Sequence, residues 1–213
     1  MPPEAVVDLL GMLAYGELLA FDRMAADARL APDTNRRAVL SEMAGNEIAN
    51  HRRLTARLIE IGAAPDEAMR PFHAALADYH DQTEPNDWLE AVTKAYVGDS
   101  IADDFFREIA EFLEQTDRQL VLDVLHDSRY GEFAADEIRS AIAADPNVAN
   151  RLSMWARRLM GEALSQAQRV AAERQAFINL LVSGAEEPND VAGLLRRLTS
   201  AHTARMAAVG LNN

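Results

Sequence analysis

Glu47 and His51 place a carboxylate and an imidazole four residues apart, a spacing that puts both side chains on one face of a helix. Apart from Asn50, the other residues one or two turns from Glu47 on that face are apolar, namely Leu40, Met43, Ala44 and Leu54. A carboxylate in such a stripe should point into a core, where its charge is costly unless it is protonated, paired or bound to metal. The pattern therefore predicts that Glu47 has a partner inside the fold, and His51 is a candidate to share a metal ion with it.

Glu17 and Asp99 lie in comparable stripes elsewhere in the chain. At helical spacing, Glu17 is surrounded by Leu13, Ala14, Phe21 and Met24, and Asp99 by Val92, Ala95, Tyr96 and Phe106. Both acids are therefore predicted to face a core. Carboxylates that project inward from several helices are the ligands with which helical bundles hold a pair of metal ions.

A repeated pattern links the two halves of the chain and adds a fourth acid. The stretch Ala14–Glu17 reappears as Ala95–Asp99 with one residue inserted, and Gly45–His51 lines up with Tyr130–Asp136. The first pair of stretches aligns Glu17 with Asp99. The second pair aligns Glu47 with Glu132. A duplicated helical hairpin with one inward acid on each of four helices accounts for both matches.

Helices must position these acids, and the sequence predicts helices almost throughout. Alanine and leucine dominate, and no sustained alternation of β-branched residues indicates a strand. Helices are expected over residues 3–30, 34–62, 87–112, 117–144, 146–183 and 189–209, with one short helix inside the connection 63–85. The predicted fold is all-α: a four-helix bundle with a long crossover over residues 1–145, and two C-terminal helices over 146–213 that pack on the bundle or on a second subunit.

Composition limits the function further. The chain has 213 residues and a net charge of -13, a surface that repels phosphate backbones, so nucleic acid is not an expected partner. The absence of cysteine excludes disulfides and thiolate metal sites. The chain has no apolar run of 18 residues, and no basic segment precedes an apolar run at its start. We therefore expect a cytoplasmic protein with no membrane contact.

The two hairpins, the crossover and the four inward acids resemble the ferritin-like di-iron carboxylate proteins. Within that superfamily, the stretch Tyr15–Leu18, the acids Glu42 and Glu47, and the segment Ala68–Phe72 are similar to actinobacterial ferritin-like proteins related to the MiaE-type hydroxylase of methylthio-isopentenyladenosine tRNA. The resemblance covers residues 4–144. It implies an oxygen-dependent non-haem di-iron hydroxylase or oxidase, with a small molecule or modified nucleoside as its substrate. For this chain the expected cofactor is a pair of iron or manganese ions.

The chain departs from the metal motif of that family at two positions. The family pattern Glu-x-x-His on the second and fourth helices requires two histidines where this chain has Asn50 and Ala135. A shifted site would instead use the next residues along, His51 and Asp136. The predicted metal ligands are then Glu17, Glu47, His51, Asp99, Glu132, Asp103 and Asp136. Such a carboxylate-rich set favours hard ions such as manganese, magnesium or calcium over iron.

The same residues also allow an interpretation without metal. Acids on helices are usually solvated or paired with basic residues one turn away, and Arg52, Arg107 and Arg139 are placed to serve some of them. The bundle would then be redox-inactive and act as a binding or assembly protein. Metal storage, a third alternative, would need a cage-forming assembly.

The C-terminal helices carry the densest positive charge. Their basic residues are Arg151, Arg157, Arg158, Arg169, Arg174, Arg196, Arg197 and Arg205. Aligned on one face, these side chains would form a basic patch for an acidic substrate, but pairing with the excess acids is the expectation. The apolar stripe of the same region would cover the bundle or face another subunit, and we expect a homodimer.

Overall fold

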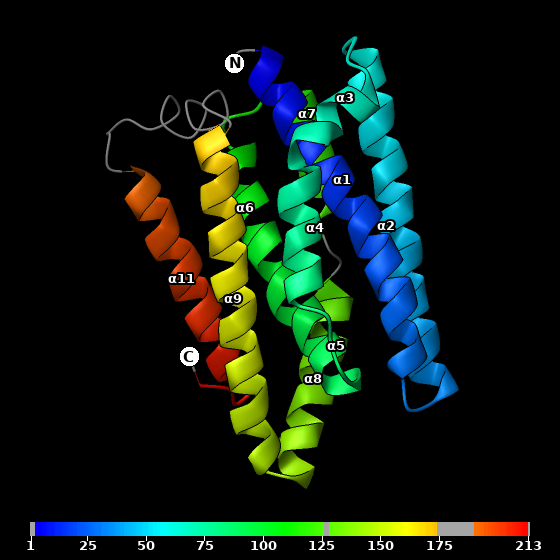
Figure 1. Cartoon of the computed structure of the whole chain (residues 1–213), viewed down its shortest axis with the longest axis vertical. Coiled ribbons are helices and arrows are strands. Elements are labelled where there is room, and N and C mark those ends of the chain that lie inside the picture. Colours follow the sequence, from blue (N-terminus) through cyan, green and yellow to red (C-terminus); the bar gives the residue numbers. More distant parts are fainter. Residues whose placement is uncertain (1–2, 126–127, 174–189, 213) are drawn as a thin grey trace.

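The computed structural model describes residues 3–125, 128–173 and 190–212, and all regular secondary structure in these residues is helical (Figure 1). The predicted all-α class is therefore confirmed. The long helices run roughly along the long axis of the molecule (Figure 1). Within the described residues, no helix is both long and apolar enough to cross a membrane.

The first hairpin consists of α1 (Pro3–Asp27) and α2 (Thr34–Glu60), which lie side by side along most of their length (Figure 1). One 3₁₀ turn, η1 (Ala28–Leu30), extends α1 into the connection. Asp33 caps α2 by accepting a hydrogen bond at 2.9 Å from a backbone N–H three residues further on, an interaction worth about 1 kcal/mol. Gly62, at φ 81°, follows the helix in the left-handed region. This hairpin matches the prediction from the sequence.

The crossover contains more helix than the single short helix predicted for it. It consists of α3 (Pro65–Met69), a 3₁₀ turn η2 (Arg70–Phe72) and α4 (His73–Gln82). The prolines do not prevent this, because Pro65 occupies the first turn of α3 and Pro71 lies within η2, where a missing N–H is tolerated. The crossover is therefore a packed part of the fold.

Gly11 allows the crossover to approach α1 closely. A Cβ atom at position 11 would lie 2.2 Å from the carbonyl oxygen of Ala68 on α3, far inside contact distance. The backbone of α3 therefore rests directly on the backbone of α1 at this point. From there α4 runs between α1 and the C-terminal helices (Figure 1).

The third helix of the bundle is continuous but contains one wide turn. It consists of α5 (Trp88–Lys94), the π-helical segment η3 (Ala95–Asp99) and α6 (Ser100–Ala110). A π turn accommodates one residue more than an α-helical turn. The π-helical segment coincides with Ala95–Asp99, the stretch that has one residue more than its counterpart Ala14–Glu17. The wide turn therefore accommodates the extra residue of the repeat.

The predicted fourth helix is instead two helices, α7 (Gln115–Val124) and α8 (Ser128–Ala144). Leu125 follows α7 in an extended conformation, at φ -65° and ψ 152°. No proline or glycine marks this break in the sequence. The reason is tertiary, because α7 and α8 pack into different apolar cores.

The C-terminal helices pack on the bundle of the same chain. The long helix α9 (Asn147–Glu173) contacts α4, α5 and α8, and α11 (Asp190–Ala208) contacts α6 and η3 (Figure 1). The predicted continuation of the long helix to residue 183 lies outside the described residues, as does Arg174.

Two large apolar cores hold the bundle together, one toward each end, and a third, small cluster of Phe72, Ala75 and Val170 joins the crossover to α9. The upper core in Figure 1 includes Leu9, Leu10, Leu13, Leu54, Leu58, Ile109, Val121 and Val124. The lower core includes Met24, Leu40, Met43, Trp88, Val92, Ile138, Trp155 and Leu159. Along α1 and α2 the stretch between the two cores contains Glu17 and Glu47. The predicted acids of the first hairpin therefore lie in a polar layer at mid-height.

Candidate functional site

The polar layer buries both glutamates of the first hairpin. Glu17 on α1 is 4% exposed and Glu47 on α2 is 3% exposed. The prediction that these two acids face the inside of the bundle is therefore confirmed. Their burial follows from the helical period, which places each in line with the leucines and methionines of the cores above and below.

Asn50 and His51 connect α2 to neighbouring helices in the same layer. The Asn50 amide Nδ2 donates a hydrogen bond to the carbonyl oxygen of Val124 at 3.0 Å and also lies 3.4 Å from Glu17 Oε2. The Nδ1 atom of His51 lies 2.7 Å from the carbonyl oxygen of Ala14. Because a carbonyl oxygen only accepts, Nδ1 carries the proton and the ring lone pair is on Nε2. Both side chains thus bind backbone groups across helix interfaces.

The acids of the second hairpin are placed differently. Asp99 at the end of η3 and Asp103 on α6 are partly buried. Glu132 and Asp136 on α8 are exposed, and Asp136 forms an ion pair with Arg139 at 2.7 Å. The prediction that Glu132 faces the core is therefore wrong.

A different face of α8 turns inward. Its buried residues include Ala134, Ala135 and Ile138. At about 100° of rotation per residue, Glu132 lies roughly 110° around the helix from the middle of that face. The break before α8 permits this rotation, because α8 does not continue the register of α7.

These positions do not fit a di-metal centre. Such a centre in a bundle needs inward carboxylates from four helices and histidines from two of them. Here the first hairpin supplies buried glutamates, but Asn50 directs an N–H group toward Glu17 and Ala135 offers no donor atom. Among the residues that the structure describes, no three histidines, aspartates or glutamates are grouped so that they could hold one metal ion. No three of the seven predicted ligands form such a group, and metal binding by them stays a prediction.

A second polar site lies where α1, α4 and α5 meet, outside the predicted set. Lys94, the last residue of α5, is 7% exposed. Its Nζ donates a hydrogen bond at 2.8 Å to the carbonyl oxygen of Thr83, and lies 5.6 Å from the centroid of the Tyr79 ring. Burial lowers the pKa of the Lys94 amine to about 8, and the carboxylate of Asp27 partly opposes that shift.

The groups around Lys94 are also perturbed by burial. Desolvation raises the pKa of Asp27 to about 6 and lowers the pKa of His80 to about 3, while the charges of Lys94 and Arg23 act to lower both values. Burial also raises the pKa of Tyr79. Three polar atoms here are buried with no hydrogen-bond partner among the described residues: Arg23 Nε, Tyr79 OH and His80 Nδ1. Perturbed and unsatisfied groups of this kind mark candidate sites.

The sequence interpretation missed this second site. Neither His80 nor Tyr79 is among the site residues that the sequence predicts. Lys94 carried a usable signal, since it lies three residues from both Ala91 and Val97, which are buried. That is the pattern that singled out Glu47.

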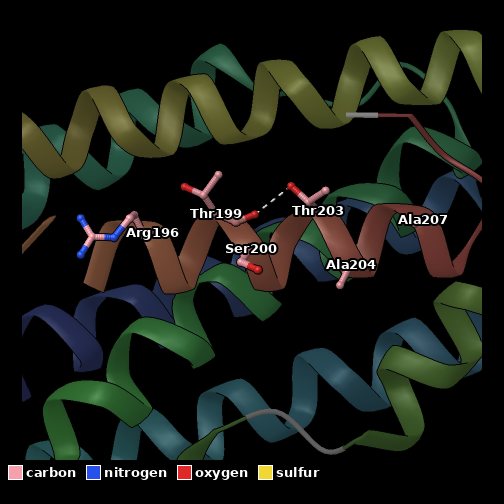
Figure 2. Close-up of a pocket in the computed structure, with 6 residues that line it drawn as sticks. All are labelled: Arg196, Thr199, Ser200, Thr203, Ala204 and Ala207. Carbon is pink, nitrogen blue, oxygen red and sulfur yellow. Dashed lines mark hydrogen bonds between the residues drawn. The ribbon is translucent and has the colours of Figure 1, made fainter. Parts of the chain in front are cut away.

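The outer face of α11 bears an open groove of about 660 Å³ (Figure 2). Its lining residues are Arg196, Thr199, Ser200, Thr203, Ala204 and Ala207. The Thr203 hydroxyl donates to the carbonyl oxygen of Thr199 at 2.9 Å, so it is used within the helix. With no acid or histidine among its lining residues, the groove offers no group for proton transfer or metal binding.

Four arginines of the C-terminal helices pair with acids. Arg197 binds Glu108 at 2.8 Å. Further ion pairs of this region join Arg151 to Asp87 and Glu90, Arg169 to Asp78, and Arg205 to Asp104. For these four arginines the predicted pairing is confirmed, and their charge is not available as an open basic patch.

Comparison of the chain with known protein families gives one match. A family model described as a ferritin-like domain of actinomycetes matches residues 3–184. No curated protein matches the chain. The matched range includes the first hairpin, the crossover, the second hairpin and the described part of α9.

Proposed function

Because the chain belongs to the family of ferritin-like domains of actinomycetes, we propose that it is a ferritin-like bundle without di-metal redox activity, which acts as a binding or assembly protein. The observation that carries this proposal is the placement of Asn50. It stands where the Glu-x-x-His pattern of the related di-iron proteins has a metal-binding histidine, and its amide connects α2 to Glu17 and to the end of α7.

The hydrogen bonds of Asn50 oppose metal binding at this position. A metal ligand must direct a lone pair at the ion, whereas the amide Nδ2 directs its N–H groups at Glu17 and at the Val124 carbonyl. An N–H donor and a metal ion compete for the same carboxylate lone pairs. The amide thus gives the buried Glu17 a neutral hydrogen-bonding partner from α2.

The fourth helix supports the same conclusion. Ala135, at the second histidine position, is buried and apolar, and Glu132 is exposed. Both halves of the Glu-x-x-His pattern are therefore missing from the inward face of α8. A metal ion bound in the layer would have to rely on the first hairpin for most of its ligands.

The competing function is a di-metal oxidoreductase or hydroxylase with a degenerate iron or manganese site. The burial of Glu17 and Glu47 at the same level favours it, because inward carboxylates on neighbouring helices are the ligands with which bundles bind metal ions. On that alternative these two glutamates and His51 Nε2 would be the first ligands. The two functions differ in one measurable property, the metal content of the purified chain.

Metal analysis tests the proposal directly. The chain is purified from cells supplied with iron and manganese, and bound metal is measured before and after reconstitution with each ion. We expect well under one ion per chain in both cases. One or two ions per chain, lost in a Glu17→Ala/Glu47→Ala variant but retained in the exposed control Glu42→Ala, would overturn the proposal.

Self-assembly is a separate part of the proposal. The expected homodimer would satisfy the assembly role, and light scattering of the purified chain measures its mass in solution. A mass of two chains supports that role. A mass of one chain leaves binding of another molecule as the proposed activity.

A further inference from the structure

Lys94 is the only lysine in a chain that has 21 lysine and arginine residues in total. Arginine supplies all the other basic side chains, including every ion pair described above. Arginine keeps its proton in proteins, whereas the amine of lysine can become neutral and nucleophilic. The one primary amine among the side chains therefore lies in a buried site, whereas the basic side chains of the surface are arginines.

The surroundings of Lys94 hold its ammonium group weakly. An ammonium has three N–H donors, and the Thr83 carbonyl accepts one of them. In the part of the chain that the structure describes, Lys94 forms no ion pair; its second contact is with the face of the Tyr79 ring. Burial makes this cation give up its proton more readily than an exposed lysine, although the acids around it oppose that effect, and the pKa is lowered to about 8.

We propose that Lys94 captures a small uncharged aldehyde or ketone as a Schiff base. This activity goes beyond the proposed function, and it does not depend on whether Glu17 and Glu47 hold metal. The ligand belongs to the class of short carbonyl compounds that carry a second oxygen, as a hydroxyl or a further carbonyl. The buried polar atoms beside the amine supply the recognition.

The reaction needs no other reagent. Lys94 first loses its ammonium proton to solvent, and its lone pair forms a bond to the carbonyl carbon while the C=O π electrons move onto oxygen. The two remaining protons of the nitrogen leave with that oxygen as water, and a C=N bond results. The imine then takes one proton from solvent and becomes a cation.

The charges around Lys94 favour a product that stays positive. The acids that interact with it electrostatically are Asp27, Glu84 and Asp99, and Arg23 is the one cation. An iminium ion keeps the charge that these acids attract. Addition of carbon dioxide would instead give a carbamate anion, which three nearby carboxylates would repel.

The burial and polarity of the site define the ligand class. An amine that is 7% exposed admits only a small reagent. Arg23 Nε and Tyr79 OH are buried atoms without a hydrogen-bond partner among the described residues, and each has a proton to donate. A second oxygen on the ligand would accept a hydrogen bond from one of these donors. An unsubstituted aldehyde has no second oxygen to accept it.

Reductive trapping with glycolaldehyde and cyanoborohydride at pH 7.5 tests the proposal, with the labelled residue located by peptide mass spectrometry. Lys94 and the N-terminal amine are the only primary amines, so the N-terminus is an internal reference. We expect Lys94 to be labelled at least about tenfold faster, relative to the N-terminus, in the folded chain than in urea. At pH 7.5 about a quarter of an amine with pKa 8 is neutral, against about one in a thousand for an ordinary lysine.

Labelling that is equal or slower in the folded chain would overturn the proposal, because it would show that burial only protects a structural hydrogen bond to Thr83. A Lys94→Arg variant should show label at the N-terminus alone. A Tyr79→Phe variant should react more slowly with glycolaldehyde but unchanged with acetaldehyde, which lacks the second oxygen. Equal rates for the parent chain and Tyr79→Phe with both probes would overturn the ligand class, and Tyr96→Phe is the matched control.

Discussion

The amide nitrogen of Asn50 lies 3.4 Å from the Oε2 atom of Glu17, so α2 offers a hydrogen-bond donor to a buried carboxylate of α1. The same nitrogen also donates to the Val124 carbonyl. One side chain therefore joins three helices in the layer between the two cores. In this role an amide is better suited than an imidazole, because its two N–H groups point in different directions from one nitrogen.

Replacing Asn50 by histidine restores the family motif on α2, and we expect the change to destabilise the chain. One imidazole nitrogen cannot donate to both Glu17 and Val124, so at least one buried acceptor loses its partner. The expected decrease in the free energy of unfolding is about 1–2 kcal/mol. Urea unfolding in the presence of a chelator measures it. The exposed control Ala49→His should change stability by less, and an Asn50→His variant as stable as the parent would contradict the structural role.

Gly11 and Gly16 lie on the same helix in opposite situations. A Cβ at Gly11 would lie 2.2 Å from the Ala68 carbonyl oxygen, whereas a Cβ at Gly16 would meet nothing within 4 Å. We expect Gly11→Ala to lower the free energy of unfolding by about 1–3 kcal/mol, because the α3 backbone must move away from α1. Gly16→Ala should raise it by about 0.5–1 kcal/mol through helix propensity. Thermal unfolding of both variants checks the prediction, and a similar effect for the two would contradict the close approach of α3.

His202 on α11 is 1% exposed, and neither of its ring nitrogens has a hydrogen-bond partner among the described residues. A neutral imidazole always carries one N–H donor, so its burial in this state is unfavourable. We expect His202→Leu, which keeps a similar volume, to raise the free energy of unfolding by about 1–2 kcal/mol. Ala204→Leu, exposed on the same helix, should have little effect. A destabilised His202→Leu variant would show that the imidazole is satisfied in solution.

Much of the first hairpin could be predicted from the sequence because its pattern is local. Glu17 and Glu47 lie in line with apolar residues of the cores on either side, so the helical period alone places them inside. The exposure of Glu132 could not be predicted in the same way. It depends on the break after Val124, which reflects the packing of α7 and α8 into separate cores and has no glycine or proline to mark it.

The spacing of Lys94 from Ala91 and Val97 indicates a buried position, but the sequence does not show which groups cover its amine. Its burial depends on the crossover, since Thr83 and Tyr79 cover the amine after α4 has packed against α1. The sequence indicated one short helix in this connection but not where it docks. Contacts between segments far apart in the chain leave no periodic signal, and the charge of Lys94 alone favoured an exposed position.

The two perturbed groups that flank Lys94 respond to acid in opposite ways. Burial lowers the pKa of His80 to about 3, whereas an unfolded histidine titrates near 6.5. Between these values the unfolded state binds a proton that the folded state does not, so the free energy of unfolding decreases as the pH falls below 6.5. For Asp27 the folded pKa of about 6 exceeds the unfolded value of 3.8, so the folded state binds the extra proton and gains stability as the pH falls through that window.

Removing each group should therefore change the acid branch of the stability curve in opposite directions. By pH 5 the His80 contribution amounts to a loss of about 2 kcal/mol, which His80→Gln should remove. Asp27→Asn should make the loss on acidification steeper. Urea unfolding at pH 7, 6 and 5 measures both slopes, with the exposed His73→Gln as the control. The lowered pKa of His202 also makes the free energy of unfolding decrease in acid, and His202 is present in every variant. The stability of His80→Gln should therefore still fall slightly as the pH decreases. A His80→Gln curve parallel to that of the parent chain would contradict the burial of a neutral imidazole beside Lys94.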